Sequence, residues 1–428
     1  MTSLKKIARR SFLIGSAAIV GGVAFGVYKI RETPPNPLKP GAGQAVLNPY
    51  VLIDGNGVSI ITPRAEMGQG VHTTLAALVA EELDIDMADI TTRHGPPAQA
   101  YFNQAVLASA LPFKEYAMSD FQHDLAGAIG QAGKLLSVQI TGGSTSVVDA
   151  YEKMRHAGAS AREALKLAAA ARLGIAPDRL RTESGHVITP DGTRISYVDL
   201  APEAAQFDPP QVALRPRSAW KQLGRSVPRV DMVEKSTGTA TFGIDIRVPG
   251  MKFAALRLNP YLGGTMRGFD ASAAKTMPGV EAVYDLGDGI AVVARNTWLA
   301  MQAADAVQVD WGPSPHPASM AAIDAALDRA FDAEANSTMR DDGDAETPPA
   351  RATEITAEYR LPYLAHATME PMNATALYED NSLTVWAGNQ SPIVLQKKCA
   401  KIAGLSPDAV TVHTTLLGGG FGRRGEVD

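Results

Sequence analysis

The sequence predicts a mixed α/β (α+β) fold spread over two or three domains. The chain has 428 residues, more than one ordinary domain holds. Short β-branched runs alternate along it with Ala-rich segments of helical periodicity. Hydrophobic residues make up 45% and charged residues 20%, with 39 Gly and 28 Pro, which is the composition of a loop-rich globular protein.

Charge and cysteine content exclude several kinds of site. The net charge of −5 gives no electrostatic reason to expect a nucleic-acid partner. The single cysteine rules out a disulfide within the chain and any Cys₄ zinc or iron–sulfur site. Cys399 lies at helical spacing from Leu395 and Ile402, which predicts a buried thiol on a helix face.

The N-terminus resembles an export signal. Basic "KKIARR" precedes the weakly apolar, Gly-rich segment 11–28, and a Pro-rich linker follows. The paired arginines before Phe12 and Leu13 resemble the twin-arginine signal. We therefore expect residues 1–46 to be a signal and linker, and the protein to be exported and periplasmic or periplasm-facing. A general signal and an uncleaved N-terminal anchor remain alternatives.

The first region, 47–210, is predicted to hold two strand–turn–helix units. A hairpin over 50–64 is followed by a turn at Gly68 and Gly70 and a helix over 71–83. The pattern repeats with a short strand at 138–142, a Gly-Ser-Thr turn and a long helix ending at Gly174. A hairpin over 182–197 closes the region, and the prolines of 201–217 indicate a linker.

Two further regions are predicted to be β-rich. Region 220–335 alternates strands with a helix over 297–306, and the polar stretch 336–350 is predicted to be a flexible surface loop. Region 352–428 begins β-rich and continues with a helix over 393–404 and a strand over 409–416.

The last strand leads into a glycine motif that is ambiguous by itself. Gly420, Gly422 and Gly425 form G-x-G-x-x-G, but no helix or ribose-binding acid follows, as a dinucleotide site requires. No Lys-Ser or Lys-Thr follows either, which excludes a P-loop. What remains is a loop that a large group approaches closely, with Phe421 as its bulky apolar member.

Five motifs taken together resemble a known family. They are "EMGQGVH" (66–72), "TGGSTS" (141–146), "AHATMEPMNATA" (365–376), "WAGNQSP" (386–392) and "GGGFGRRGE" (418–426). Their order is similar to that in the molybdopterin-binding subunits of the xanthine dehydrogenase and aldehyde oxidase family, isoquinoline 1-oxidoreductase beta type. The resemblance implies an N-terminal portion of the second molybdenum-binding domain (47–210), an α/β hammerhead domain (220–335) and the start of the first molybdenum-binding domain (352–428).

The resemblance also implies roles for particular residues. Gln390 and Phe421 are placed at the catalytic centre, beside the metal and the substrate funnel. Cofactor binding is assigned to three groups of residues: Met67, Gly68, Gln69 and Gly70; Gly143, Ser144, Thr145 and Ser146; and Gly420, Phe421 and Gly422. No side chain is expected to ligate the metal directly, because the pterin holds it. Helix capping by Gln390, a core role for Phe421 and simple helix capping by Ser144 or Ser146 remain alternatives.

The implied cofactor is molybdenum–molybdopterin, with the cytosine dinucleotide form as one option. The family hydroxylates aldehydes or N-heterocycles with water and passes two electrons to iron–sulfur clusters. One cysteine cannot hold such clusters, so the implied partners are a small [2Fe-2S] subunit and an electron acceptor such as a cytochrome. The family's general-base glutamate lies in a C-terminal G-x-G-E-type motif that the sequence lacks, so we expect a truncated or split subunit that is inactive alone. A second chain that completes it and a broken gene are the two alternatives.

Other residues and other classes of protein stay open at this stage. His366 and Glu370 have metal-pair spacing, yet a structural role is expected. Arg423 and Arg424 differ from the residues usual at these positions of the family's motif. Glu426 lies one residue out of register with a glutamate that contacts substrate in the family's purine enzymes. His72 is either a cofactor contact or a surface residue. The alternatives to an enzyme are a noncatalytic relic and an exported ligand-binding protein.

Overall fold

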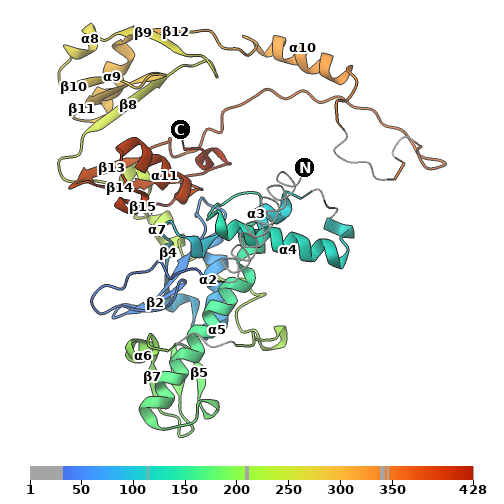
Figure 1. The fold of residues 1–428 in the computed structure, drawn as a ribbon, viewed down its shortest axis with the longest axis vertical. Helices are drawn as coiled ribbons and strands as arrows, with labels where there is room; N and C mark the ends of the chain where they lie inside the picture. The colour runs from blue at the N-terminus through green and yellow to red at the C-terminus, as the bar shows by residue number, and fades with distance from the viewer. Residues whose placement is uncertain are drawn as a thin grey trace, which may run out of the picture. The chain divides into compact units, whose positions relative to one another are not determined.

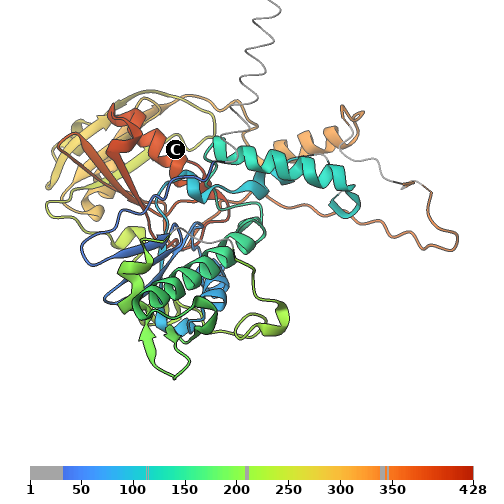
Figure 2. The same ribbon diagram turned by 60° about the horizontal axis from the view of Figure 1, so that its bottom comes forward.

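The computed structural model describes residues 32–111, 113, 115–207, 212–337, 343–344 and 347–427. The expected export signal falls before residue 32, and the expected polar loop 336–350 falls partly within the other gaps. The chain divides into two compact units: residues through Ile246 together with His366–Asp428, and Arg247–Ala365. The N-terminal part and the C-terminal part, red in Figures 1 and 2, thus belong to one unit.

The first unit contains a four-stranded sheet in the order β1-β2-β3-β4. The strands are β1 (Ala45–Asn48), β2 (Val51–Asp54), β3 (Gly57–Thr62) and β4 (Ile90–His94). The first three are antiparallel neighbours, whereas β4 runs parallel to β3. A parallel pair needs a crossover, and α2 (Val71–Leu83) supplies it. The predicted hairpin over 50–64 and helix over 71–83 are confirmed.

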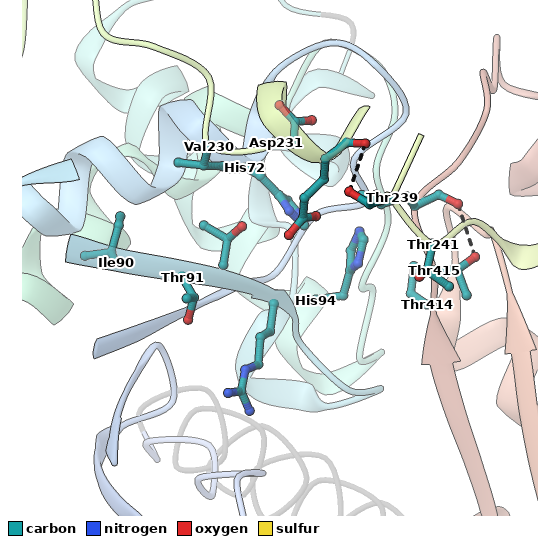
Figure 3. A pocket seen from close by; sticks show the side chains of 14 residues that line it. His72, Ile90, Thr91, His94, Val230, Asp231, Thr239, Thr241, Thr414 and Thr415 are labelled. Atoms are coloured by element: carbon teal, nitrogen blue, oxygen red, sulfur yellow. Dashed lines mark hydrogen bonds between the residues drawn. The ribbon is translucent and has the colours of Figure 1, made fainter. Parts of the chain in front are cut away.

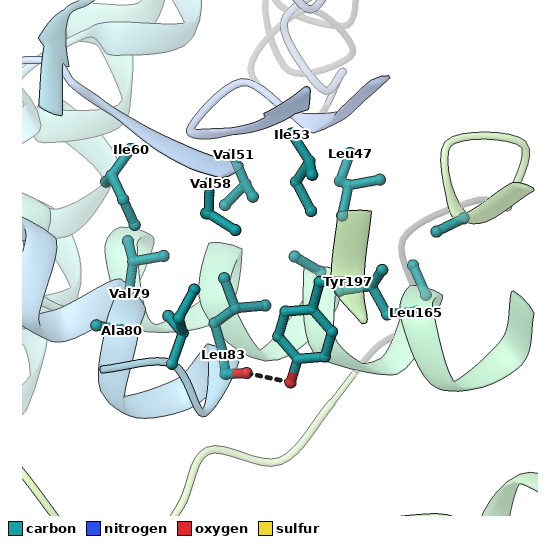
Figure 4. Close-up of a cluster of buried hydrophobic side chains, with 14 of the residues drawn as sticks. Leu47, Val51, Ile53, Val58, Ile60, Val79, Ala80, Leu83, Leu165 and Tyr197 are labelled. Atoms are coloured by element: carbon teal, nitrogen blue, oxygen red, sulfur yellow. Dashed lines mark hydrogen bonds between the residues drawn. The ribbon is translucent and has the colours of Figure 1, made fainter. Parts of the chain in front are cut away.

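Helices α2, α5 (Ser146–Leu173) and α6 (Tyr197–Ala204) bury the apolar side of this sheet. Figure 4 shows Val51, Ile53 and Ile60 of the sheet facing side chains from these helices. Helix α5 approaches α2 closely at Gly158, because an added Cβ would lie 2.4 Å from the Val79 carbonyl oxygen. The rigid core holds the turn before α2 in place.

Smaller elements complete the N-terminal part. They are α3 (Gln104–Ser109), α4 (Asp120–Leu135), β5 (Arg181–Glu183), β6 (His186–Ile188), β7 (Arg194–Ser196) and α7 (Met232–Thr237). The strands β5-β6-β7 confirm the predicted hairpin and extend it to a three-stranded sheet. The strand predicted at 138–142 is wrong, because Thr141 pairs singly with Gln390.

The predicted linker over 201–217 is also wrong. The first residues of the predicted linker form the end of α6. The backbone from Arg215 onward is fixed to α2 by buried carboxylates. Glu82 accepts the N–H of Arg215, and Glu81 accepts the N–H groups of Lys221 and Gln222. Proline content indicated irregular backbone but not this attachment.

The C-terminal part forms a second α/β layer of the same unit. Its strands β13 (Thr375–Glu379), β14 (Ser382–Ala387) and β15 (Val410–Thr414) have the order β13-β14-β15, and α11 (Pro392–Ala403) connects the parallel pair β14 and β15. The predicted helix and final strand are confirmed within a residue or two at each end. The β-rich stretch expected from residue 352 is confirmed where β13 and β14 lie, whereas residues 353–374 form no strand.

The second unit has its own small core. Its strands are β8 (Phe253–Leu258), β9 (Met266–Asp270), β10 (Val280–Asp285), β11 (Gly289–Ala294) and β12 (Gln308–Trp311), and its helices are α8 (Ser272–Lys275), α9 (Thr297–Ala306) and α10 (Met320–Phe331). Sheet β10-β11-β8 packs against α9, which confirms the helix predicted at 297–306. Mixed α/β structure is confirmed in both units. Within the described residues, no helix is both long and apolar enough to cross a membrane.

Candidate functional site

The glycine turn between β3 and α2 is held by the carboxylate of Glu66. Its Oε1 accepts from the N–H groups of Gly68 (2.9 Å) and Gly70 (3.2 Å), and its Oε2 accepts from the N–H of His72 (3.1 Å). Gly68 and Gly70 have φ of 109° and 84°, which L side chains rarely adopt. Burial alone raises the pKa of Glu66, but these donors and Lys235 together lower that pKa below its ordinary value.

Gln69 spans the same turn with its side chain. Its Oε1 accepts from the N–H of Met67 (2.8 Å), and its Nε2 donates to the carbonyl of Ala65 (2.8 Å). The expected donors of the turn, including the Gln69 amide, are therefore bonded within the chain. The N–H groups of Met67, Gly68 and Gly70 thus already have acceptors in side chains of the same turn.

The second glycine turn, Gly143–Ser146, begins α5. Gly143 and Ser144 are exposed with φ of 60° and 56°, and Thr145 is the N-cap residue without a side-chain cap bond. The Thr145 hydroxyl instead donates to the carbonyl of Gly142 (2.7 Å) and accepts from Nδ2 of Asn103 (2.8 Å). Capping by Ser144 or Ser146 is thus excluded, and the turn presents backbone at the N-terminus of a long helix.

Gln390 joins this second turn to the C-terminal part. Its Nε2 donates to the carbonyl of Thr141 (2.7 Å), and the Thr141 N–H donates back to the Gln390 carbonyl (2.8 Å). The Thr141 hydroxyl accepts from the N–H of Ala65 (2.8 Å), which precedes the first glycine turn. Three of the predicted motifs therefore meet at Thr141 and Gln390, two residues 249 positions apart in the sequence.

Gly420 brings the fourth motif to the same place. It is buried, and a Cβ added to it would lie 2.4 Å from Sδ of Met67 and 3.2 Å from Oε1 of Gln390. Phe421 is 71% exposed and has a φ of 53°, which excludes a core role for its ring. Gly422 is exposed with a φ of 87°.

The C-terminal glycine loop is held by a buried ion pair that the sequence did not reveal. Arg424 Nε donates to the carbonyl of Gly419 (2.8 Å), and its Nη2 donates to Oε2 of Glu370 (3.0 Å). Glu370 Oε2 also accepts the Gly418 N–H (2.9 Å). The structural role expected for Glu370 is confirmed, and Arg424 supports the same loop.

We call the place where Met67, Thr141, Gln390 and Gly420 come together the junction. Other residues noted in the sequence lie away from the junction or at its edge. His366 and Glu426 are exposed. The Cys399 thiol, predicted to be buried, is half-buried and packs in the same cluster as Leu395. Ile402 is exposed, so it does not belong to the buried face of the helix. Burial raises the pKa of the Cys399 thiol.

A buried polar atom without a partner lies at the junction: Gln390 Oε1, 3.2 Å from the position of a Cβ added to Gly420. Among the described residues, Asn389 Oδ1, His72 Nε2 and Arg424 Nη1 are also buried without a partner. A buried polar atom without a hydrogen bond is costly, so Gln390 Oε1 indicates a place for a polar group from outside the chain. The residues present therefore fit a bulky polar cofactor beside Gln390 and Gly420. No described cluster of His, Cys, Asp or Glu has the arrangement of a metal site.

A cavity of about 550 Å³ in the same unit is lined by His72 and His94, among other residues (Figure 3). His72 follows the first glycine turn, His94 ends β4, and their ring centroids are 4.3 Å apart. Threonines 91, 92, 239, 241, 414 and 415 make much of the remaining wall. Burial lowers the pKa of His72 to about 4 and holds that of His94 well below its ordinary value, so both imidazoles are neutral near pH 7. His72 is thus a buried residue of a cavity wall and not a surface helix histidine.

Comparisons with known proteins agree with the motifs. One model described as a molybdopterin cofactor-binding domain matches residues 330–427, and a second such model matches residues 12–111. The chain is 29% identical to the beta subunit of isoquinoline 1-oxidoreductase from Brevundimonas diminuta, over 98% of this chain and 56% of that protein. It is 28% identical to a nicotinate dehydrogenase subunit from Pseudomonas putida, over 87% of this chain and 30% of that protein.

These matches indicate a class of protein and then a family. Both models describe binding of a molybdopterin cofactor, and together they match two separate parts of the chain. The chain is similar to the molybdopterin-binding subunits of the xanthine dehydrogenase and aldehyde oxidase family, and among them to the isoquinoline 1-oxidoreductase beta subunit. The chain spans about half the length of that relative. A solved structure, the aldehyde oxidoreductase from Desulfovibrio gigas, is 19% identical over 86% of this chain and 47% of that chain, with a TM-score of 0.34.

Proposed function

We propose that this chain is the cofactor-binding part of a molybdenum hydroxylase that oxidises aldehydes or N-heteroaromatic compounds with water as the oxygen source. The observation that carries the proposal is the meeting of four motifs in one unit. Gln390 bonds Thr141 at 2.7 Å, and Gly420 approaches both Gln390 and Met67. The names of the relatives, which include an isoquinoline oxidoreductase and a nicotinate dehydrogenase, support an N-heteroaromatic substrate.

Each residue at the junction has a task in this proposal. When bound, the molybdenum cofactor supplies the two-electron oxidation and the transfer of oxygen from water. Thr141 fixes the Gln390 amide, whose Oε1 faces Gly420 and has no other partner. Gly420 lets the loop backbone approach Gln390 and Met67 closely, and the exposed Phe421 ring offers an apolar wall for an aromatic substrate. The exposed Gly143 and Ser144 offer a turn for a further polar part of the cofactor.

The proposal extends to partners, cofactor form and location. With one cysteine, the chain needs a separate [2Fe-2S] subunit as its first electron acceptor, followed by a carrier such as a cytochrome. The cytosine dinucleotide form of the cofactor and an α/β hammerhead fold for the second unit are parts of this proposal. The paired Arg9 and Arg10 support export to the periplasm, with the cofactor inserted before transport.

Metal analysis of protein purified from its host tests the proposal. We expect about one molybdenum atom per chain, together with extractable pterin. The variant Gln390→Ala is expected to lose most of both per folded protein, while Gln206→Ala, an exposed glutamine on the first unit, keeps them. Wild-type protein without molybdenum and pterin would indicate instead a noncatalytic relic or an exported ligand-binding protein. Oxidation of quinoline or an aldehyde with an artificial acceptor then separates the two substrate classes.

A further inference from the structure

Every polar group of Glu66, in its backbone and its side chain, forms a hydrogen bond. Its N–H donates to Nε2 of His94 (3.0 Å), at the end of β4, and its carbonyl accepts from the N–H of Leu417 (3.0 Å), just before the C-terminal glycine loop. Its carboxylate holds the turn from Gly68 to His72, as described above. The side chain is completely buried. One residue thus connects three segments that are far apart in the sequence.

Cations from a fourth segment compensate the charge of Glu66. Arg229 Nη2 donates to Glu66 Oε1 (3.1 Å), while Nη1 donates to the carbonyl of Gly68 (2.9 Å). Lys235 Nζ lies 3.6 Å from the same Oε1. Asp231 pairs with both cations and orients them. Segment 229–235 is thereby fastened to the glycine turn.

This is the arrangement of a backbone anion site whose anion belongs to the chain. Successive N–H groups of glycine-rich turns form concavities that bind anions, and nearby cations strengthen them. A buried carboxylate persists only when such donors and charges replace its water. Here the N–H groups of Gly68, Gly70 and His72 perform that task for Glu66.

We propose that Glu66 is a positioning residue, an internal anion that sets the glycine turn so that Met67 meets Gln390 and Gly420. External anions, including a phosphate of the cofactor, do not reach the N–H groups of Gly68 and Gly70, because Glu66 already occupies them. The turn therefore contributes shape to the cofactor site through Met67. The relevance of this positioning to the cofactor rests on the proposed function, whereas the occupancy of the turn by Glu66 does not.

Removal of the internal anion, followed by its replacement with a soluble one, tests the proposal. In Glu66→Ala, hydrogen exchange of the full chain, read by mass spectrometry on peptides covering 66–72, is expected to accelerate about tenfold or more. Sodium formate at about 100 mM should restore at least half of the lost protection, since formate fits the emptied carboxylate position. In Glu66→Gln the neutral amide fills the space, so formate should restore nothing. Glu183→Ala, which removes an exposed carboxylate paired with Arg181, is the matched control without effect.

A milder variant keeps the test decisive if Glu66→Ala does not fold. Arg229→Gln removes a half-exposed cation and should accelerate exchange over the same residues without general unfolding. Unchanged exchange in both variants, or equal formate effects in Glu66→Ala and Glu66→Gln, would overturn the proposal. Cofactor content provides the second readout: formate in the growth medium should raise molybdenum per folded chain in Glu66→Ala only. If wild-type protein holds no molybdenum, the proposed function fails while the exchange and formate results still decide the role of Glu66.

Discussion

Replacing Gly420 by alanine is the sharpest perturbation of the junction. The new Cβ would lie 2.4 Å from Sδ of Met67, well inside the separation of about 3.5–4.0 Å at which such atoms attract. The φ of Gly420 is not in the left-handed region, so backbone strain does not add to the effect. Overpacking of a filled site costs about 1–3 kcal/mol, and we expect a loss of stability in that range.

A double-mutant cycle assigns this loss to the thioether. Equilibrium unfolding in urea, followed by circular dichroism, should show that Met67→Ala removes most of the effect of Gly420→Ala, with a coupling of about 1 kcal/mol or more. Gly425→Ala is the matched control, because nothing lies within 4 Å of the position of its added Cβ. Equal losses in Gly420→Ala and Gly425→Ala, or additive effects of Met67→Ala, would refute the packing described here.

Three further predictions concern buried charges and titrating groups. Asp149→Asn leaves Arg64 buried without its counter-charge, and urea unfolding should show a loss of about 3–5 kcal/mol, against a small change for Glu183→Gln. The pKa of His72 is lowered to about 4 in the folded protein, so stability is full above the ordinary histidine value of about 6.5 and falls as the pH drops toward 4. Thermal midpoints between pH 7 and 4 should therefore fall less in His72→Gln than in the wild type. Glu370→Gln weakens the bonds to the C-terminal glycine loop, and faster proteolysis there is expected at an overall cost of about 1–3 kcal/mol.

Local patterns predicted the elements whose signals are local. The Asn56-Gly57 turn gave the first hairpin, and Gly174 ended the long helix because it supplies a left-handed C-cap with a φ of 65°. The strand expected at 138–142 failed for a nonlocal reason. Ile140 and Thr141 are β-branched, but their backbone partners are Asn103 and Gln390, distant residues that no window of sequence contains.

The sequence motifs predicted the residues of the site. They did not predict the residues that hold those residues in position. Gln390, Gly420 and Met67 belong to distinctive glycine-rich motifs, and they do come together in the structure. Arg424 and Glu66 belong to the same motifs. Arginine and glutamate are seldom buried, so their residue types alone predict that both lie at the surface. Spacing alone carries no signal that a side chain turns inward to bond its own loop.

Internal carboxylates explain why glycine-rich turns mislead when they are interpreted as open anion sites. Glu66 fills the first turn, Glu81 accepts N–H groups of the segment after α6, and Glu370 accepts the Gly418 N–H. In each case glycine or irregular backbone exposes N–H groups, and an acid of the chain satisfies them where a ligand was the simpler expectation. The turn at Gly143–Ser146 differs, because Gly143 and Ser144 are exposed and the carboxylate of its helix, Asp149, bonds Arg64 and the Gln104 N–H. We therefore propose that the second of the two predicted cofactor turns receives an anionic group, while the first shapes the site from within.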